Sequence, residues 1–86
     1  MKTINLKKTN ENTIEPKELI LGVIDTTNYK VSGDMMKMAI IRDAISKATD
    51  SIELEDADFE MLKKFITEYP NYQGIGAVDV LKRFEI

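Results

Sequence analysis

The sequence predicts a mainly α-helical domain of three to four helices with a short N-terminal β-strand or hairpin. Three segments repeat apolar residues at the spacing of one helical face, whereas the first residues alternate polar and apolar side chains. Of the 86 residues, 43% are hydrophobic and 31% are charged, a composition typical of a folded protein. We therefore expect one domain over residues 1–86, with a β element in residues 1–15 and helices in residues 16–86.

The N-terminal residues 2–7 alternate in polarity, which would place Ile4 and Leu6 on one buried face of a strand. Polar residues at 9–12 favour a turn, after which residues 13–15 could return as a second strand. The pattern leaves open whether the β element is a hairpin or one strand.

A first helix is predicted over residues 16–26. Proline is well suited to the first turn of a helix, and apolar residues then recur on one face: Leu19, Ile20, Val23 and Ile24. The same run is rich in β-branched residues, and Gly22 in its middle disfavours a helix by roughly 1 kcal/mol. Between helix and strand, we favour the helix.

A second helix is predicted over residues 33–49, with Ser32 as its N-cap. Its main apolar stripe is Met38, Ile41, Ala44, Ile45 and Ala48. Met35, Met36 and Ile40 fall outside this stripe, so the helix is either central and packed on two sides or exposes an adaptable contact surface. We favour central packing.

A third helix is predicted over residues 56–69, with Glu55 as its N-cap and Pro70 just beyond its end. Leu54 and Phe59 are spaced to form a hydrophobic staple, and aspartates in the first turn suit the helix dipole. The core stripe continues through Leu62, Phe65, Ile66 and Tyr69.

A short last helix is predicted from its apolar residues, after a loop over residues 71–76. Those residues are Ala77, Val80, Leu81 and Phe84. A helix of about two turns forms only when it is docked on the others.

The residue types present exclude several chemistries. The chain has neither His nor Cys, which removes the usual zinc ligands and the usual catalytic triads. The spacing of Asp56, Asp58 and Glu60 resembles part of a calcium-binding loop, but Met61 stands where a glycine is needed and Thr67 where a glutamate is needed. Paired carboxylates would need a cleft, for which a domain of this size has little room. We expect no metal, no cofactor and no enzymatic activity.

Charge and hydropathy restrict the partners. The net charge is −3, and a helix that begins with carboxylates would repel phosphate, so we expect no direct nucleic-acid binding. The apolar runs are too short to span a bilayer, and the polar N-terminus does not resemble a signal peptide, so we expect a cytoplasmic protein without membrane contact.

The acidic stretch is the strongest candidate for a partner-binding site. Six carboxylates and no basic residue lie between Lys47 and Lys63, a charge distribution able to attract a basic protein surface. Such a stretch is also the ordinary solvated start of a helix. Tyr72, in the loop, supplies an aromatic anchor of the kind enriched at interfaces. The candidate partner-binding residues are Glu53, Glu55, Asp56, Asp58, Glu60 and Tyr72.

Two segments carry a resemblance to a group of known proteins. The opening MKTINL (residues 1–6) and the helix start L-x-D-A-D-F-x-x-L-K (residues 54–63) resemble small uncharacterised proteins of tailed bacteriophages and prophages. The resemblance implies a phage or prophage origin, a bacterial host cytoplasm and an accessory or assembly role, with no catalytic residue or cofactor to carry over. Glu55 stands where that pattern more often has Ser or Thr, and the Met-rich second helix has no counterpart.

These observations favour a non-enzymatic phage accessory protein that binds, and could inhibit, a host protein through an acidic helical surface. The alternative is a phage structural or assembly protein that self-associates through Met35, Met36 and Ile40 as a homo-oligomer.

Overall fold

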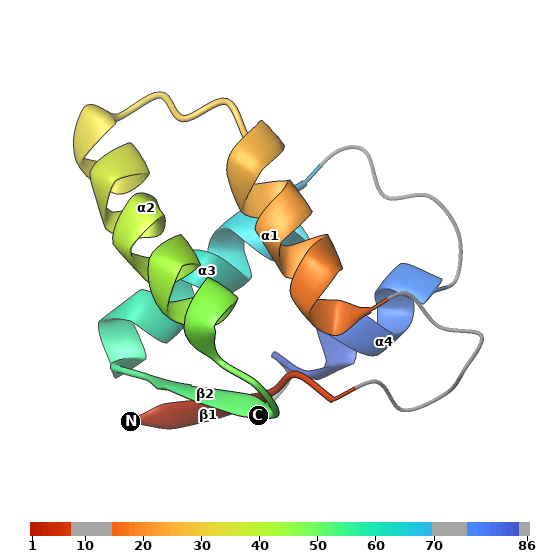
Figure 1. Ribbon diagram of the computed structural model, residues 1–86. Helices are drawn as coiled ribbons and strands as arrows, with labels where there is room; N and C mark the ends of the chain where they lie inside the picture. Colours follow the sequence, from red (N-terminus) through yellow and green to blue (C-terminus); the bar gives the residue numbers. More distant parts are fainter. Residues whose placement is uncertain (8–14, 70–75, 85–86) are drawn as a thin grey trace.

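The computed structural model describes residues 1–7, 15–69 and 76–84, which form four helices and two strands (Figure 1). In chain order they are β1 (Lys2–Asn5), α1 (Pro16–Thr26), α2 (Ser32–Lys47), β2 (Ser51–Leu54), α3 (Asp56–Thr67) and α4 (Gly76–Lys82). The predicted class, a small mainly α domain with an N-terminal β element, is confirmed.

The β element pairs segments far apart in the chain. β1 runs antiparallel to β2, with Lys2 opposite Leu54 and Ile4 opposite Ile52, and the Leu6 amide extends the pairing by donating to Asp50 O at 2.8 Å. The polarity pattern suggested residues 13–15 as a possible second strand instead. Residues 13 and 14 lie outside the described residues, and residue 15 directly precedes α1 without belonging to a strand.

The helix boundaries agree with most of the predictions. α1 spans the predicted residues, and α3 begins where predicted, with Glu55 at its N-cap, but ends two residues earlier than expected. α2 also begins one residue early: Val31 holds the N-cap and Ser32 is already helical, so the predicted Ser32 cap is wrong.

The core draws buried apolar side chains from both strands and all four helices. The largest side chains in it include Phe59 of α3 and Phe84 just after α4, whose ring centroids lie 5.6 Å apart. The predicted staple residues Leu54 and Phe59 are both buried in this cluster. Burying such side chains supplies about 1.5 to 3 kcal/mol each, which is what holds the short helix α4 in place.

α2 buries only one of its sides. Its core residues are Met38, Ile41 and Ile45, whereas Met35, Met36 and Ile40 are 50%, 67% and 68% exposed. The prediction that α2 is central and packed on two sides is therefore wrong. The helix packs against α1 at the edge of the molecule (Figure 1), and the described elements leave its outer side uncovered.

Candidate functional site

The acidic residues gather around the start of α3. Glu53 lies on β2, Glu55 caps the helix, and Asp56, Asp58 and Glu60 occupy its first turns. All are exposed except Asp58, which is half-buried. Carboxylates at this end of a helix are stabilised by the unpaired amides of the first turn. The sixth candidate, Tyr72, lies outside the described residues.

Tertiary structure brings cations to this cluster that the sequence keeps far away. The N-terminal residues 1–7 and α2 supply four positive groups, each within 4.0 Å of a carboxylate. The pairs are the Met1 amino group with Asp56 (3.5 Å), Lys2 with Glu60 (3.2 Å), Lys7 with Asp50 (3.9 Å) and Lys37 with Asp58 (3.0 Å). Among the described residues, only Glu53 and Glu55 of the six carboxylates remain without an ion pair. The acidic field is consequently weaker than the sequence suggested.

The pair of Lys37 and Asp58 connects α2 to the start of α3. The Nζ of Lys37 lies 3.0 Å from Oδ1 of Asp58. Hydrogen bonding to Asp58 and its negative charge raise the pKa of Lys37, and the nearby charge of Glu55 adds to the effect. Lys37 therefore stays positively charged at neutral pH and links the two helices at this point.

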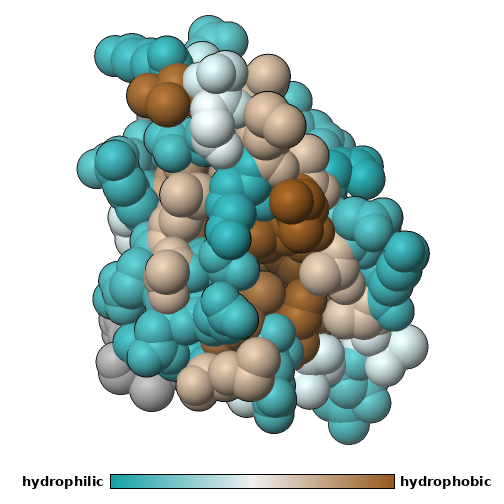
Figure 2. Space-filling model, turned by 90° about the vertical axis from the view of Figure 1, so that its left-hand side faces the viewer, coloured by the Kyte–Doolittle hydropathy of each residue, from teal (hydrophilic) through white to brown (hydrophobic). Residues whose placement is uncertain are grey.

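A second surface lies on the outer side of α2. We call Met35, Met36 and Ile40 the α2 apolar face; it contributes three of the large hydrophobic side chains exposed among the described residues. Met36 and Ile40 are four residues apart and so lie one above the other on the helix. Figure 2 views the molecule from the side of α2, and apolar side chains gather there between hydrophilic ones.

One ion pair links the helix of the α2 apolar face to the acidic start of α3. Lys37 directly follows Met36 and precedes Ile40 by three residues, so it flanks the same side of the helix. Its ammonium reaches Asp58 in the first turn of α3. Lys37 thus connects the two surfaces that the sequence offered as separate candidates.

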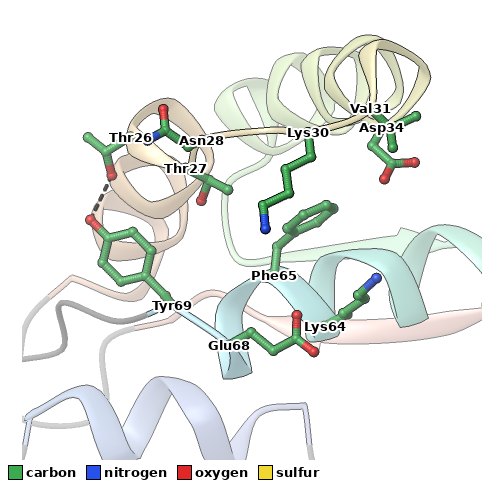
Figure 3. A pocket seen from close by; sticks show the side chains of 10 residues that line it. All are labelled: Thr26, Thr27, Asn28, Lys30, Val31, Asp34, Lys64, Phe65, Glu68 and Tyr69. Carbon is green, nitrogen blue, oxygen red and sulfur yellow. Dashed lines mark hydrogen bonds between the residues drawn. The ribbon is translucent and has the colours of Figure 1, made fainter.

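A pocket of about 660 Å³ lies elsewhere, between the end of α1, the α1–α2 connection and the last turn of α3 (Figure 3). From the size of the domain we expected little room for a cleft, and the sequence did not predict this pocket. Apart from apolar periodicity, the residues that form it carried no signal, because the pocket arises from where the α1–α2 connection lies relative to the end of α3. It is lined by Thr26, Thr27, Asn28, Lys30, Val31, Asp34, Lys64, Phe65, Glu68 and Tyr69.

Two further findings concern metals and membranes. Over residues 1–7, 15–69 and 76–84, no three His, Cys, Asp or Glu side chains are grouped so that they could hold a metal ion. In the same part of the chain, no helix has the length and apolar character needed to cross a membrane.

Comparison with protein-family models, with curated proteins and with solved structures finds no match for this chain. The resemblance to phage and prophage proteins stays a prediction.

Proposed function

We propose that the protein is a non-enzymatic protein-binding module whose contact surface is the α2 apolar face together with the acidic start of α3. The observation that carries the proposal is the exposure of Met36 and Ile40, each about two-thirds accessible, on the helix whose Lys37 pairs with Asp58 of α3. Adjacent exposed apolar side chains of this size often mark interaction sites, and flexible methionines suit a surface that adapts to its partner.

The chemistry of this surface favours a basic partner segment that also presents apolar side chains. Glu53 and Glu55 have no ion pair among the described residues, and the chain carries a net charge of −3. An acidic edge accelerates the approach of a basic segment, and apolar contact then slows its dissociation. A basic amphipathic helix has both properties. In the setting that the phage resemblance implies, such a segment would belong to a host or phage protein.

The experiment uses a synthetic amphipathic helical peptide of Leu and Lys as the probe. We expect it to bind the protein, and we expect the double variant Met36→Ser/Ile40→Ser to bind it about tenfold more weakly, since each substitution removes apolar contact area. Val78→Ser is the matched control because Val78 is also an exposed apolar residue but lies on α4. Equal affinity of the double variant and the wild type would contradict the proposal.

Charge is tested with the same probe. Glu55→Lys should weaken binding at low salt and have little effect at high salt, because exposed charges are screened. An otherwise identical peptide of Leu and Glu should not bind. Binding of the acidic peptide as tightly as the basic one would show that the carboxylates play no part.

Self-association through the α2 apolar face is the second candidate, favoured by the exposure of Met35 as well as Met36 and Ile40. An apolar face can pack on its own copy across a two-fold axis, because such an interface uses the same patch twice. Light scattering at micromolar concentration separates the candidates. A dimer that Ile40→Asp converts to a monomer supports self-association, and a wild-type monomer rejects it.

A further inference from the structure

The pocket beside α3 has features that the proposed function does not use. Its volume of about 660 Å³ falls within the range of small-molecule sites, roughly 300 to 1,000 Å³. One wall is the α1–α2 connection with the first turn of α2, and the other is the C-terminal part of α3 (Figure 3). Its lining residues include none of Met35, Met36, Ile40 or the carboxylates at the start of α3.

Each wall carries one ammonium and one carboxylate. Lys30 and Asp34 belong to the first wall, and Lys64 and Glu68 to the second. None of these four charges lies within 4.0 Å of an opposite charge among the described residues, although all four line one pocket. The walls therefore offer charges of both signs to a molecule between them.

An aromatic surface lies between these charges. Lys30 extends from the connection toward the ring of Phe65 (Figure 3), and Nζ of Lys64 lies 5.9 Å from the centroid of that ring. Tyr29 packs edge-on against Phe65, with ring centroids 5.0 Å apart. This contact holds the Phe65 ring as a preformed apolar wall.

A hydrogen bond joins two residues that line the pocket near Tyr69. The hydroxyl groups of Thr26 and Tyr69 lie 2.7 Å apart and join the end of α1 to the residue just beyond the C-cap of α3 (Figure 3). A bound molecule would therefore meet fixed hydroxyl and aromatic groups at this end and the charged side chains beyond it.

We propose that this pocket binds a free α-amino acid with an apolar side chain. The carboxylate of the amino acid pairs with the ammonium of Lys30 or Lys64, its ammonium pairs with the carboxylate of Asp34 or Glu68, and its side chain packs on Phe65. Such a zwitterion satisfies charges on both walls at once. A simple anion would meet the two carboxylates, and a simple cation the two lysines, so each would bind less well.

The test is a titration of the isotope-labelled protein with L-phenylalanine, followed by amide chemical shifts. We expect shifts confined to the pocket and an affinity of order millimolar, because the ligand is small and the pocket is open. N-acetyl-L-phenylalanine lacks the ammonium and L-phenylalanine amide lacks the carboxylate, so each should bind about fivefold more weakly, a loss of about 1 kcal/mol. Absence of shifts in the pocket, or equal affinity for all three compounds, would overturn the proposal.

Two charge variants and their controls make the test independent of folding. Lys30→Gln and Glu68→Gln should each weaken L-phenylalanine binding about fivefold. The controls Lys82→Gln and Glu18→Gln replace exposed charges outside the pocket and should bind as the wild type does. A loss of binding in the controls as large as that in the pocket variants would also reject the assignment.

Discussion

Lys37 of α2 lies 3.0 Å from Asp58 in the first turn of α3, and this contact joins the apolar and the acidic parts of the proposed binding surface. The two residues are far apart in the sequence, and each belongs to a helix with its own amphipathic pattern. Neither pattern predicts the contact. It depends on where tertiary packing places α2 relative to the start of α3.

The Lys37 contact should stabilise the fold at neutral pH and lose its effect in alkali. The pKa of Lys37 is raised above 10.5 by Asp58, so the stabilising contribution is complete below the unfolded pKa and is lost as the pH rises through the folded one. Lys37→Gln should lower the free energy of unfolding at pH 7 and flatten its alkaline dependence. Urea unfolding at several pH values measures both, with Lys82→Gln as the control. An alkaline dependence unchanged in Lys37→Gln would contradict this account.

The ion pair of Asp25 and Arg42 should act in the opposite pH range. Nε and Nη2 of Arg42 donate to the two carboxylate oxygens of Asp25 at 2.5 and 3.1 Å, tying α1 to α2. The hydrogen bond to Arg42, together with its charge, lowers the pKa of Asp25 below 3.8 despite partial desolvation.

The stabilisation from Asp25 is present above the unfolded pKa and is lost as the pH falls through the lowered folded value. Asp25→Asn should therefore reduce stability at pH 7 and lose less stability on acidification than the wild type does. Thermal unfolding from pH 7 down to pH 2 measures the effect. If the unfolding temperatures of Asp25→Asn and the wild type fall in parallel between pH 7 and pH 2, the ion pair does not contribute to the pH dependence of stability.

Phe84 should be the residue that keeps α4 docked. It is fully buried and packs at 5.6 Å from Phe59. Phe84→Ala should cost about 3 to 5 kcal/mol, a large part of the stability of a domain this size. Since that variant can fail to fold, Phe84→Leu provides a milder test with an expected loss of about 1 kcal/mol.

The control is Val78→Ala, at an exposed position of α4, which should change the free energy of unfolding by less than about 0.5 kcal/mol. Equal losses of stability from the Phe84 and Val78 substitutions would contradict the placement of Phe84 in the core.

Gly22 should be replaceable with a gain in stability. It lies inside α1, is exposed, and a Cβ added there would meet no atom within 4 Å. Gly22→Ala should therefore raise the free energy of unfolding by about 0.5 to 1 kcal/mol, because glycine is the poorer helix former. Chemical denaturation measures the change, and a loss of stability would show that α1 is packed differently.

The sequence predicted the elements better than their arrangement. The helical spacing of Ile20, Val23 and Ile24 was sufficient for α1, and the staple of Leu54 and Phe59 located the start of α3. The strand β2 was not predicted. It has four residues, so its alternation of polar and apolar side chains is too short to stand out beside the strong helical pattern that follows.

The candidate site was also predicted only in part, because tertiary contacts between distant residues cannot be read from the sequence pattern. Five of the predicted residues do lie together, because they are close in the sequence, but their cations come from residues 1, 2 and 37 through tertiary contacts. The exposure of Ile40 could not be decided from periodicity either, since an apolar residue off the main stripe fits both a central helix and an open surface. The pocket depends on the path of the α1–α2 connection, for which the sequence has no periodic pattern.

The most direct test of the proposed binding surface is to map where the Leu and Lys peptide contacts the wild-type protein, by amide chemical shifts. We predict the largest shifts at residues 35–40 of α2 and 53–60 of β2 and α3, and their decrease as salt is added. Shifts spread evenly over the molecule, or confined to α1 and α4, would contradict the account.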